Sequence, residues 1–180
     1  FHGERKPKPI GRGGARLKIA ASATGASAGI SARKHGVELA TSDVHVVLRD
    51  TEVLAVAIAT RHDSHAGLVC DALRAGKHVF VEKPLALTLE ELAAIREAYE
   101  GFGAVNPGPT AGRPVLMVGF NRRFSPHARR MKALLDSVVE PKCFVMTVNA
   151  GALPHEHWTQ DRDAGSGRLV GEASHFIDLL

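Results

Sequence analysis

The strongest constraint on the fold is an uninterrupted apolar run at residues 53–59, Val-Leu-Ala-Val-Ala-Ile-Ala. The run does not alternate between apolar and polar residues, so it does not predict a strand with one face in water. A continuous apolar run of this length is typical of a strand that is buried on both faces of a parallel sheet. We therefore expect a buried parallel strand at this point in the chain.

Helices and strands alternate after this run. Asp63 or Ser64 can cap a helix whose apolar residues recur at helical spacing until Gly76 ends it. A strand is expected at residues 78–81, and Thr88 and Glu91 have capping-box spacing at the start of a helix that runs to about residue 100. The remaining expected elements are a Gly- and Pro-rich loop at 101–114, a strand at 115–118 and a basic helix at 126–135.

The segment before the apolar run has weaker signals. Residues 1–16 are basic and rich in Gly and Pro, which predicts a linker rather than a helix or a strand. A strand is expected at 17–23, a helix at 26–35 that Gly36 closes, and a second helical stretch at 42–48.

This alternation predicts an α/β fold with a doubly wound parallel sheet, because helices of this length connect parallel strands by right-handed crossovers. The pattern changes after Asp136, where a strand is expected at 143–148, followed by a loop rich in His, Gly and Asp and a helix from about Gly171. We expect the sheet domain to cover residues 17–123, and a connecting helix with the start of a second, α+β domain to cover residues 124–180.

Polar residues follow three of the expected strands. The clusters are residues 60–65 (Thr-Arg-His-Asp-Ser-His), 82–84 (Glu-Lys-Pro) and 121–123 (Asn-Arg-Arg). Ligands of doubly wound sheets bind beyond the carboxyl ends of the strands, so we expect the three clusters to converge. Pro84 restricts the backbone of Lys83 to an extended or turn conformation, which suits a positioned proton donor or acceptor.

These clusters carry a resemblance to a known family. Residues 57–65, the run Gly-Lys-His-Val-Phe-Val-Glu-Lys-Pro at 76–84 and the Gly-Phe-Asn-Arg-Arg-Phe segment at 119–124 resemble the Gfo/Idh/MocA oxidoreductases, the family of glucose-fructose oxidoreductase and inositol dehydrogenase. Residues 165–168 followed by His175-Phe-Ile-Asp resemble the start of the helix that carries the family's catalytic His. The resemblance covers residues 17–180 and implies an incomplete Rossmann-like sheet.

The resemblance also implies a function. It is hydride transfer between NAD or NADP and the hydroxyl of a sugar or polyol, with Lys83 and His175 handling the hydroxyl proton. The implied cofactor-binding residues are Thr60, His62, His65, Glu82, Lys83, Asn121 and Arg122. The implied substrate-binding residues are Arg123, His157, Trp158 and Glu172. The alternatives are a non-catalytic nucleotide- or sugar-binding regulator of the same fold and an inactive fragment.

The sequence departs from the family pattern at three places. No strand leads into a G-x-G-x-x-G turn, which in dinucleotide-binding folds cradles the pyrophosphate. Residues 22–25 (Ser-Ala-Thr-Gly) hold no acid for an NAD ribose, so NAD and NADP both stay open. Gly171 stands where many members have an Asp, and Glu172, three residues before His175, is the nearest acid. We therefore expect the chain to be part of a longer protein.

The net charge of the chain does not by itself exclude any class of binding partner. The net charge of +4 and the pI of about 9.3 make nucleic acid a candidate partner. The basic residues between 121 and 132 have no interleaved aromatic platform, and aromatic residues make up only 5% of the chain, so we expect a solvated helix face and no nucleic acid. The expected partners are a small sugar or polyol and a second copy of the chain, bound through the second domain.

The remaining composition bears on location and metals. Cys70 and Cys143 lie far apart without C-x-x-C spacing, which favours a reducing compartment and hence the cytoplasm. No apolar stretch approaches the roughly 20 residues that span a bilayer. Although the chain has 10 His residues, neither the His-Glu-His at 155–157 nor His62 with His65 fits a zinc motif, so no metal is expected.

Overall fold

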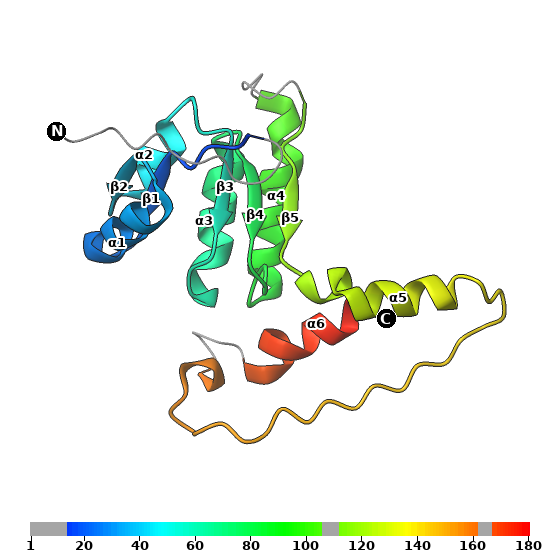
Figure 1. The fold of residues 1–180 in the computed structure, drawn as a ribbon. Coiled ribbons are helices and arrows are strands. Elements are labelled where there is room, and N and C mark those ends of the chain that lie inside the picture. The colour runs from blue at the N-terminus through cyan, green and yellow to red at the C-terminus, as the bar shows by residue number, and fades with distance from the viewer. Residues whose placement is uncertain (1–13, 106–111, 162–166) are drawn as a thin grey trace. The chain divides into compact units, whose positions relative to one another are not determined.

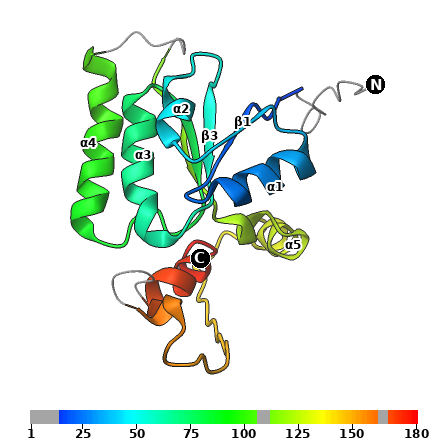
Figure 2. The same cartoon turned by 90° about the vertical axis from the view of Figure 1, so that its left-hand side faces the viewer.

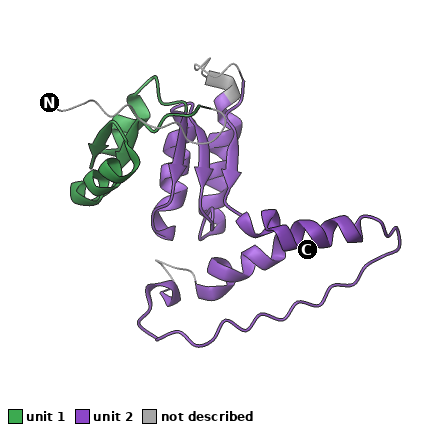
Figure 3. Ribbon diagram, in the orientation of Figure 1, with its two compact units in different colours: residues 1–54 green, residues 55–180 purple. Residues whose placement is uncertain are grey.

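The structure is a computed structural model that describes residues 14–105, 112–161 and 167–180 (Figure 1). The chain divides into two compact units, residues 1–54 and residues 55–180 (Figure 3). Most of the predicted N-terminal linker lies outside the described residues. The predicted domain boundary between residues 123 and 124 falls inside the second unit and stays a prediction.

The first unit is a short parallel β-α-β segment followed by a helix. Its elements are β1 (Ile19–Ala21), α1 (Gly25–His35), β2 (Leu39–Thr41) and α2 (Val44–Arg49). Strands β1 and β2 pair in parallel with Ile19 opposite Leu39, and the Asp43 side chain caps α2 by accepting from the His45 amide at 2.8 Å. The predicted strand and helices are confirmed with shifted ends. Sequence analysis missed β2, because its three residues form no apolar run and only their pairing with β1 defines them as a strand.

The second unit contains a three-stranded parallel sheet. Its elements are β3 (Ala55–Ile58), the 3₁₀ turn η1 (His62–Ser64), α3 (His65–Arg74), β4 (His78–Val81), α4 (Leu89–Val105) and β5 (Leu116–Val118). The strand order is β3-β4-β5, with Ile58 opposite Val81 and Val81 opposite Val118. Parallel strands that alternate with helices confirm the α/β class.

The core of this unit lies on one face of the sheet, where α3 and α4 pack side by side (Figure 2). Ile58, Val79 and Val81 point to this face and are buried. The prediction that residues 53–59 form a strand buried on both faces is wrong, because Ala55 and Ala57 are exposed. Their side chains alternate with those of Val56 and Ile58 and so point away from the two helices.

Helix α4 begins with the predicted capping box. The Glu91 amide donates to Thr88 Oγ1 at 3.1 Å, and Glu91 Oε2 accepts from the Thr88 amide at 3.3 Å and from the Leu87 amide at 2.6 Å. The helix continues to Val105 instead of ending near residue 100, so the predicted loop begins later than expected. Phe102 explains the extension, because its ring is buried against Gly76 at the end of α3.

The C-terminal part of the unit is helical at both ends and extended between them. The 3₁₀ turn η2 (Asn121–Phe124) leads into α5 (Pro126–Leu135), which is the predicted basic helix, and Ser125 caps it. A 3₁₀ turn, η3 (Trp158–Gln160), a π-helical turn (Leu169–Ala173) and α6 (Ser174–Ile177) follow. The predicted helix near Gly171 is therefore confirmed, with a start at Leu169.

The predicted strand at residues 143–148 is wrong. These residues are extended but belong to no strand, and Phe144 and Val145 are exposed. A β-strand requires a neighbouring backbone for its hydrogen bonds, and none of the described residues pairs with this segment. Among the described helices, none has the length and hydropathy needed to cross a membrane.

Candidate functional site

The three predicted clusters lie at the carboxyl edge of one sheet. Hydrogen bonds continue the pairing past the strand ends: the Glu82 amide donates to Ile58 O at 2.9 Å, and the Gly119 amide donates to Val81 O at 2.8 Å. Gly119 lies so close to Glu82 that an added Cβ would be 2.9 Å from Glu82 Oε2. The predicted convergence of the clusters is thus confirmed, with Thr60 and Asn121 exposed on either side of Glu82 in strand order.

His65 joins the first cluster to the second. Its ring is fully buried, with Nδ1 2.7 Å from Pro84 O and Nε2 3.1 Å from Thr60 O. The ring therefore holds the Lys83–Pro84 turn, whose peptide bond is cis, against the end of β3. Contact between His65 and a cofactor stays a prediction, and the burial of the ring does not support it.

Lys83 reaches from the β4 end to the C-terminal helical segment. Its Nζ donates to the carbonyl of Gly171, 88 residues further along the chain, and lies 3.6 Å from Glu172 Oε1. Sequence analysis named Gly171 but could not assign it this role, because its contribution is a backbone carbonyl on the π-helical turn. The contact brings the two predicted catalytic regions together.

The arginines of η2 contact the same helical segment. Arg122 lies 3.6 Å from Glu172 Oε2, with its guanidinium carbon 4.4 Å from the centre of the Phe176 ring. Arg123 donates through Nε to Asp178 Oδ2 at 2.8 Å and through Nη2 to Asp178 Oδ1. The prediction that Arg123 binds substrate is not supported, because its guanidinium is occupied by this carboxylate.

His175 lies in the middle of these contacts. Its side chain is buried, the Phe120 ring faces it edge-on at 6.0 Å, and its Nδ1 has no hydrogen-bond partner among the described residues. Burial lowers the pKa of His175, and the positive charges of Lys83 and Arg122 lower it further, against the opposite effect of Glu172 and Glu82. At neutral pH the ring is therefore neutral and can accept a proton.

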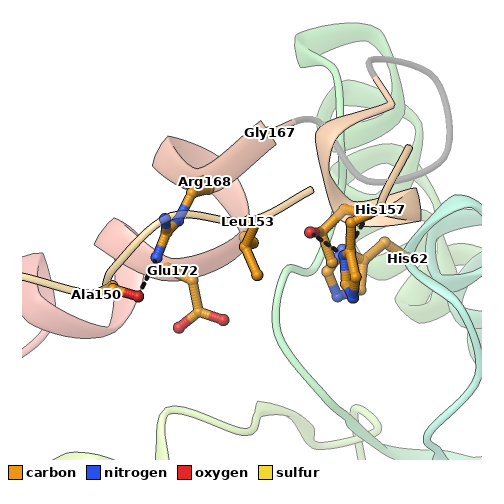
Figure 4. A pocket seen from close by; sticks show the side chains of 9 residues that line it. His62, Ala150, Leu153, His157, Gly167, Arg168 and Glu172 are labelled. Carbon is orange, nitrogen blue, oxygen red and sulfur yellow. Dashed lines mark hydrogen bonds between the residues drawn. The ribbon is translucent and has the colours of Figure 1, made fainter. Parts of the chain in front are cut away.

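A cavity of about 340 Å³ opens beside Glu172 (Figure 4). His62 and His157 lie on one side of it, Arg168 and Glu172 on the other, and Leu153 between them. His157 and Glu172 both line this cavity, and their roles near substrate stay predictions.

Trp158 flanks the cavity without lining it. Its ring is 4.9 Å from that of His62, edge to face, and 6.1 Å from that of His157. The three rings connect η1 with η3. Trp158 therefore fixes the wall that the two His residues form.

Arg168 shapes the opposite wall, and sequence analysis included it in the 165–168 segment without giving it a role in the site. Its guanidinium donates to Gly151 O at 2.5 Å and to Ala150 O at 3.1 Å, which holds the extended segment against the helical turn. No sequence signal could have identified it, because both acceptors are backbone carbonyls. Arg168 thereby forms part of the cavity wall.

Two further observations concern metal-ligating side chains and the basic helix. Among the described residues, no group of three or more His, Cys, Asp or Glu side chains could hold a metal ion. Lys132, one of the basic residues considered for nucleic acid, forms an ion pair with Asp136 on its own helix at 2.9 Å.

The groups at the sheet edge fit one end of a nicotinamide cofactor. Thr60 and Asn121 offer exposed hydroxyl and amide groups beside Glu82, and Nδ1 of His175 is buried without a hydrogen-bond partner among the described residues. The Gly-rich turn that would cradle the pyrophosphate does not occur in the sequence.

Comparisons with known proteins agree with this geometry. The profile of an oxidoreductase family with an NAD-binding Rossmann fold matches residues 8–105. The levoglucosan dehydrogenase of Pseudarthrobacter phenanthrenivorans is 31% identical over 173 residues, which cover 90% of this chain and 41% of that protein. Inositol 2-dehydrogenase 2 of Saccharopolyspora erythraea is 38% identical over 113 residues, which cover 63% of this chain and 30% of that protein.

Solved structures show the same relationship. A levoglucosan dehydrogenase in complex with NADH and levoglucosan superposes with a TM-score of 0.70 at 30% identity, covering 91% of this chain and 43% of that one. A putative myo-inositol dehydrogenase of Sinorhizobium meliloti gives a TM-score of 0.71 at 28% identity, covering 94% and 47%. The chain thus spans less than half the length of these relatives, and the Rossmann-like fold class is confirmed. The chain belongs to the Gfo/Idh/MocA family of oxidoreductases.

Proposed function

We propose that the chain forms the nicotinamide-facing and substrate-facing part of an NAD- or NADP-dependent dehydrogenase that acts on the hydroxyl of a sugar or polyol. One observation carries the proposal. The Lys83 ammonium and the neutral, buried His175 ring are brought to one site by the hydrogen bond from Lys83 to Gly171. A charged donor next to a neutral acceptor is the arrangement that the oxidation of an alcohol requires.

The residues have separate tasks in this reaction. The unpartnered Nδ1 of His175 accepts the hydroxyl proton, and Lys83 donates a hydrogen bond to the same oxygen as charge develops on it. Glu172 lies between Lys83 and Arg122 and orients both cations. The bound nicotinamide supplies the acceptor for the hydride that leaves the carbon.

Binding is divided between the sheet edge and the cavity. Thr60, His62, Glu82 and Asn121 would contact the nicotinamide and its ribose, because they follow the carboxyl ends of β3, β4 and β5. The sugar or polyol ring would occupy the cavity, whose size suits a small ring and whose wall carries His157 and Glu172. Relatives named for levoglucosan and inositol support a cyclic polyol as substrate.

Binding and turnover test the proposal together. Thermal melts with NAD⁺ and with NADP⁺ should show a higher melting temperature for one of them, because a ligand of the native state stabilises it by mass action. Levoglucosan and myo-inositol are then assayed for formation of reduced cofactor. His175→Gln and Lys83→Met should each lower kcat by about 10²–10⁴-fold, the usual contribution of a positioned acid or base.

Lys132→Met is the matched control, because it removes a lysine whose ion pair lies on the exposed side of α5. It should turn over at the unchanged rate. A nucleotide that binds without any oxidation of a cyclic polyol would contradict the proposal and favour a binding or regulatory protein. Full activity of the Lys83→Met variant would remove Lys83 from the mechanism.

A further inference from the structure

The short helix that carries His175 has little of its own to hold it in place. Helix α6 has 4 residues and follows a π-helical turn of 5 residues. Helices of this length are unstable in isolation. Leu169 and Ile177 are 81% and 70% exposed, so apolar burial anchors the segment only in part. Its position therefore depends on polar contacts.

The polar contacts that reach this segment from the sheet edge come from two places. Lys83 binds the Gly171 carbonyl and lies near Glu172, inside the proposed site. Arg122 of η2 contacts Glu172 and Phe176, and Arg123 of η2 binds Asp178. Of these contacts between described residues, the Arg123–Asp178 pair alone does not involve a group that shifts the pKa of His175.

That pair has the geometry of a strong anchor. The guanidinium fork engages both oxygens of the Asp178 carboxylate, and Nη2 lies 3.3 Å from the Asp178 carbonyl. The Asp178 side chain is only 9% exposed, so its charge requires a partner whenever the segment is docked. A planar bidentate contact also fixes direction, which a lysine would not do.

We propose that the Arg123–Asp178 ion pair is a positioning latch that docks the His175 helix against the Lys83 turn and so assembles the site. Asp178 lies three residues after His175, so the two side chains share one side of the helical segment. Release of the carboxylate frees the segment that carries both His175 and Gly171. Arg123 is a positioning residue in this arrangement, because its guanidinium is paired with Asp178.

The assembly of a catalytic site by this ion pair rests on the proposed function. The docking of the helix does not, since the position of His175 can be measured without cofactor or turnover. The ring is faced by Lys83 from the β4 turn, Arg122 from η2, Glu172 from the π-helical turn and Glu82 from the end of β4. A detached helix would take the ring into water and away from these charges. Its pKa would then rise toward the ordinary value of about 6.5.

The experiment is an NMR titration of the His175 imidazole, assigned by comparison with His175→Gln. Arg123→Met and Asp178→Asn are each expected to raise the pKa of His175 and to remove amide-exchange protection from residues 169–178, while the amides of β3–β5 stay protected. Lys132→Met, which breaks an exposed ion pair on α5, should change neither measurement.

The double variant Arg123→Met/Asp178→Asn separates a latch from the penalty of one unpaired charge. It should behave like the single variants, because the anchor is gone in all three. Wild-type values in the double variant, or in both single variants, would overturn the proposal. If Arg123→Met unfolds the whole protein, Arg123→Lys replaces it, and a rise in the His175 pKa is again expected because the fork is lost.

The outcomes also distinguish this proposal from the proposed function. If the single variants shift the pKa of His175 but the wild-type protein has no dehydrogenase activity, the proposed latch is supported and the proposed function is contradicted. If the wild-type protein is active but Arg123→Met leaves the pKa of His175 unchanged, the proposed function is supported and the latch is contradicted.

Discussion

His65 shows how a residue at the right place in the sequence can have a different task in the structure. Its position after β3, in the first polar cluster, is compatible with a ring that points to a cofactor or with one that points inward. The structure places the ring inward, between the carbonyls of Thr60 and Pro84. The residue type and spacing are the same in both cases, so only the packing decides.

We predict that His65→Leu lowers the free energy of unfolding by about 1–3 kcal/mol, because the buried Pro84 carbonyl loses its hydrogen-bond donor. His65→Gln retains an amide donor and should recover part of the loss. Urea denaturation of the purified variants measures the difference. His127→Leu is the control, since His127 is exposed on α5. Equal stabilities of the two Leu variants would show that the His65 ring does not hold the turn.

At the scale of elements, the helix ends that carry a capping signal were the most predictable features. Gly76 ends α3 as expected, with φ of +73°, and the Lys77 amide donates back to Ala72 O at 3.0 Å. The Thr88 capping box and the start of α5 were equally readable, because caps depend on neighbouring residues only. The strand expected at 143–148 and the missed β2 failed for the opposite reason, since strands depend on distant partners.

Gly76 and Gly67 allow a matched test of this contrast. Gly76→Ala should destabilise the protein by about 1–2 kcal/mol, because a left-handed backbone is strained for Ala and its Cβ would lie 3.2 Å from the buried Phe102 ring. Gly67→Ala lies inside α3 with nothing within 4 Å, so it should stabilise by up to about 1 kcal/mol. Thermal or urea unfolding measures both. Similar effects of the two substitutions would contradict the assigned C-cap.

At the scale of the whole molecule, the two units are stabilised differently. The second unit has the buried core between its sheet and α3 and α4. The first unit relies more on charge: Lys18 Nζ lies 2.7 Å from Asp50 Oδ2 and 2.7 Å from Glu52 Oε2. The hydrogen bonds from Lys18 lower the pKa of both carboxyl groups, and these carboxylates raise the pKa of Lys18.

These shifts predict the pH dependence of the first unit. Carboxyl groups with lowered pKa stabilise the folded state above their unfolded pKa of about 4, and this contribution disappears as the pH falls through their folded pKa. The raised pKa of Lys18 stabilises below its unfolded value of about 10.4, and that contribution is lost as the pH rises through its folded pKa. The ion pairs of Lys18 therefore contribute fully to the stability of the first unit between about pH 5 and pH 10.

Hydrogen exchange of the β1 and β2 amides at several pH values measures this dependence. Lys18→Met should flatten the acid-side loss of protection in these amides, and Lys132→Met, in the second unit, should not. A wild-type acid profile in the Lys18→Met protein would show that the ion pairs do not stabilise the first unit.

The sequence by itself determined the α/β class, the alternation of strands and helices in residues 53–135, the family, and the motifs at the strand ends. Each depends on local pattern: apolar runs, caps and short polar motifs that follow strands. The relation of Lys83 to Gly171, the Arg123–Asp178 pair, the inward ring of His65 and the wall made by Arg168 were decided only by the tertiary structure. In each of these contacts a side chain meets a backbone carbonyl or a charged group elsewhere in the chain. No local pattern encodes which group that will be.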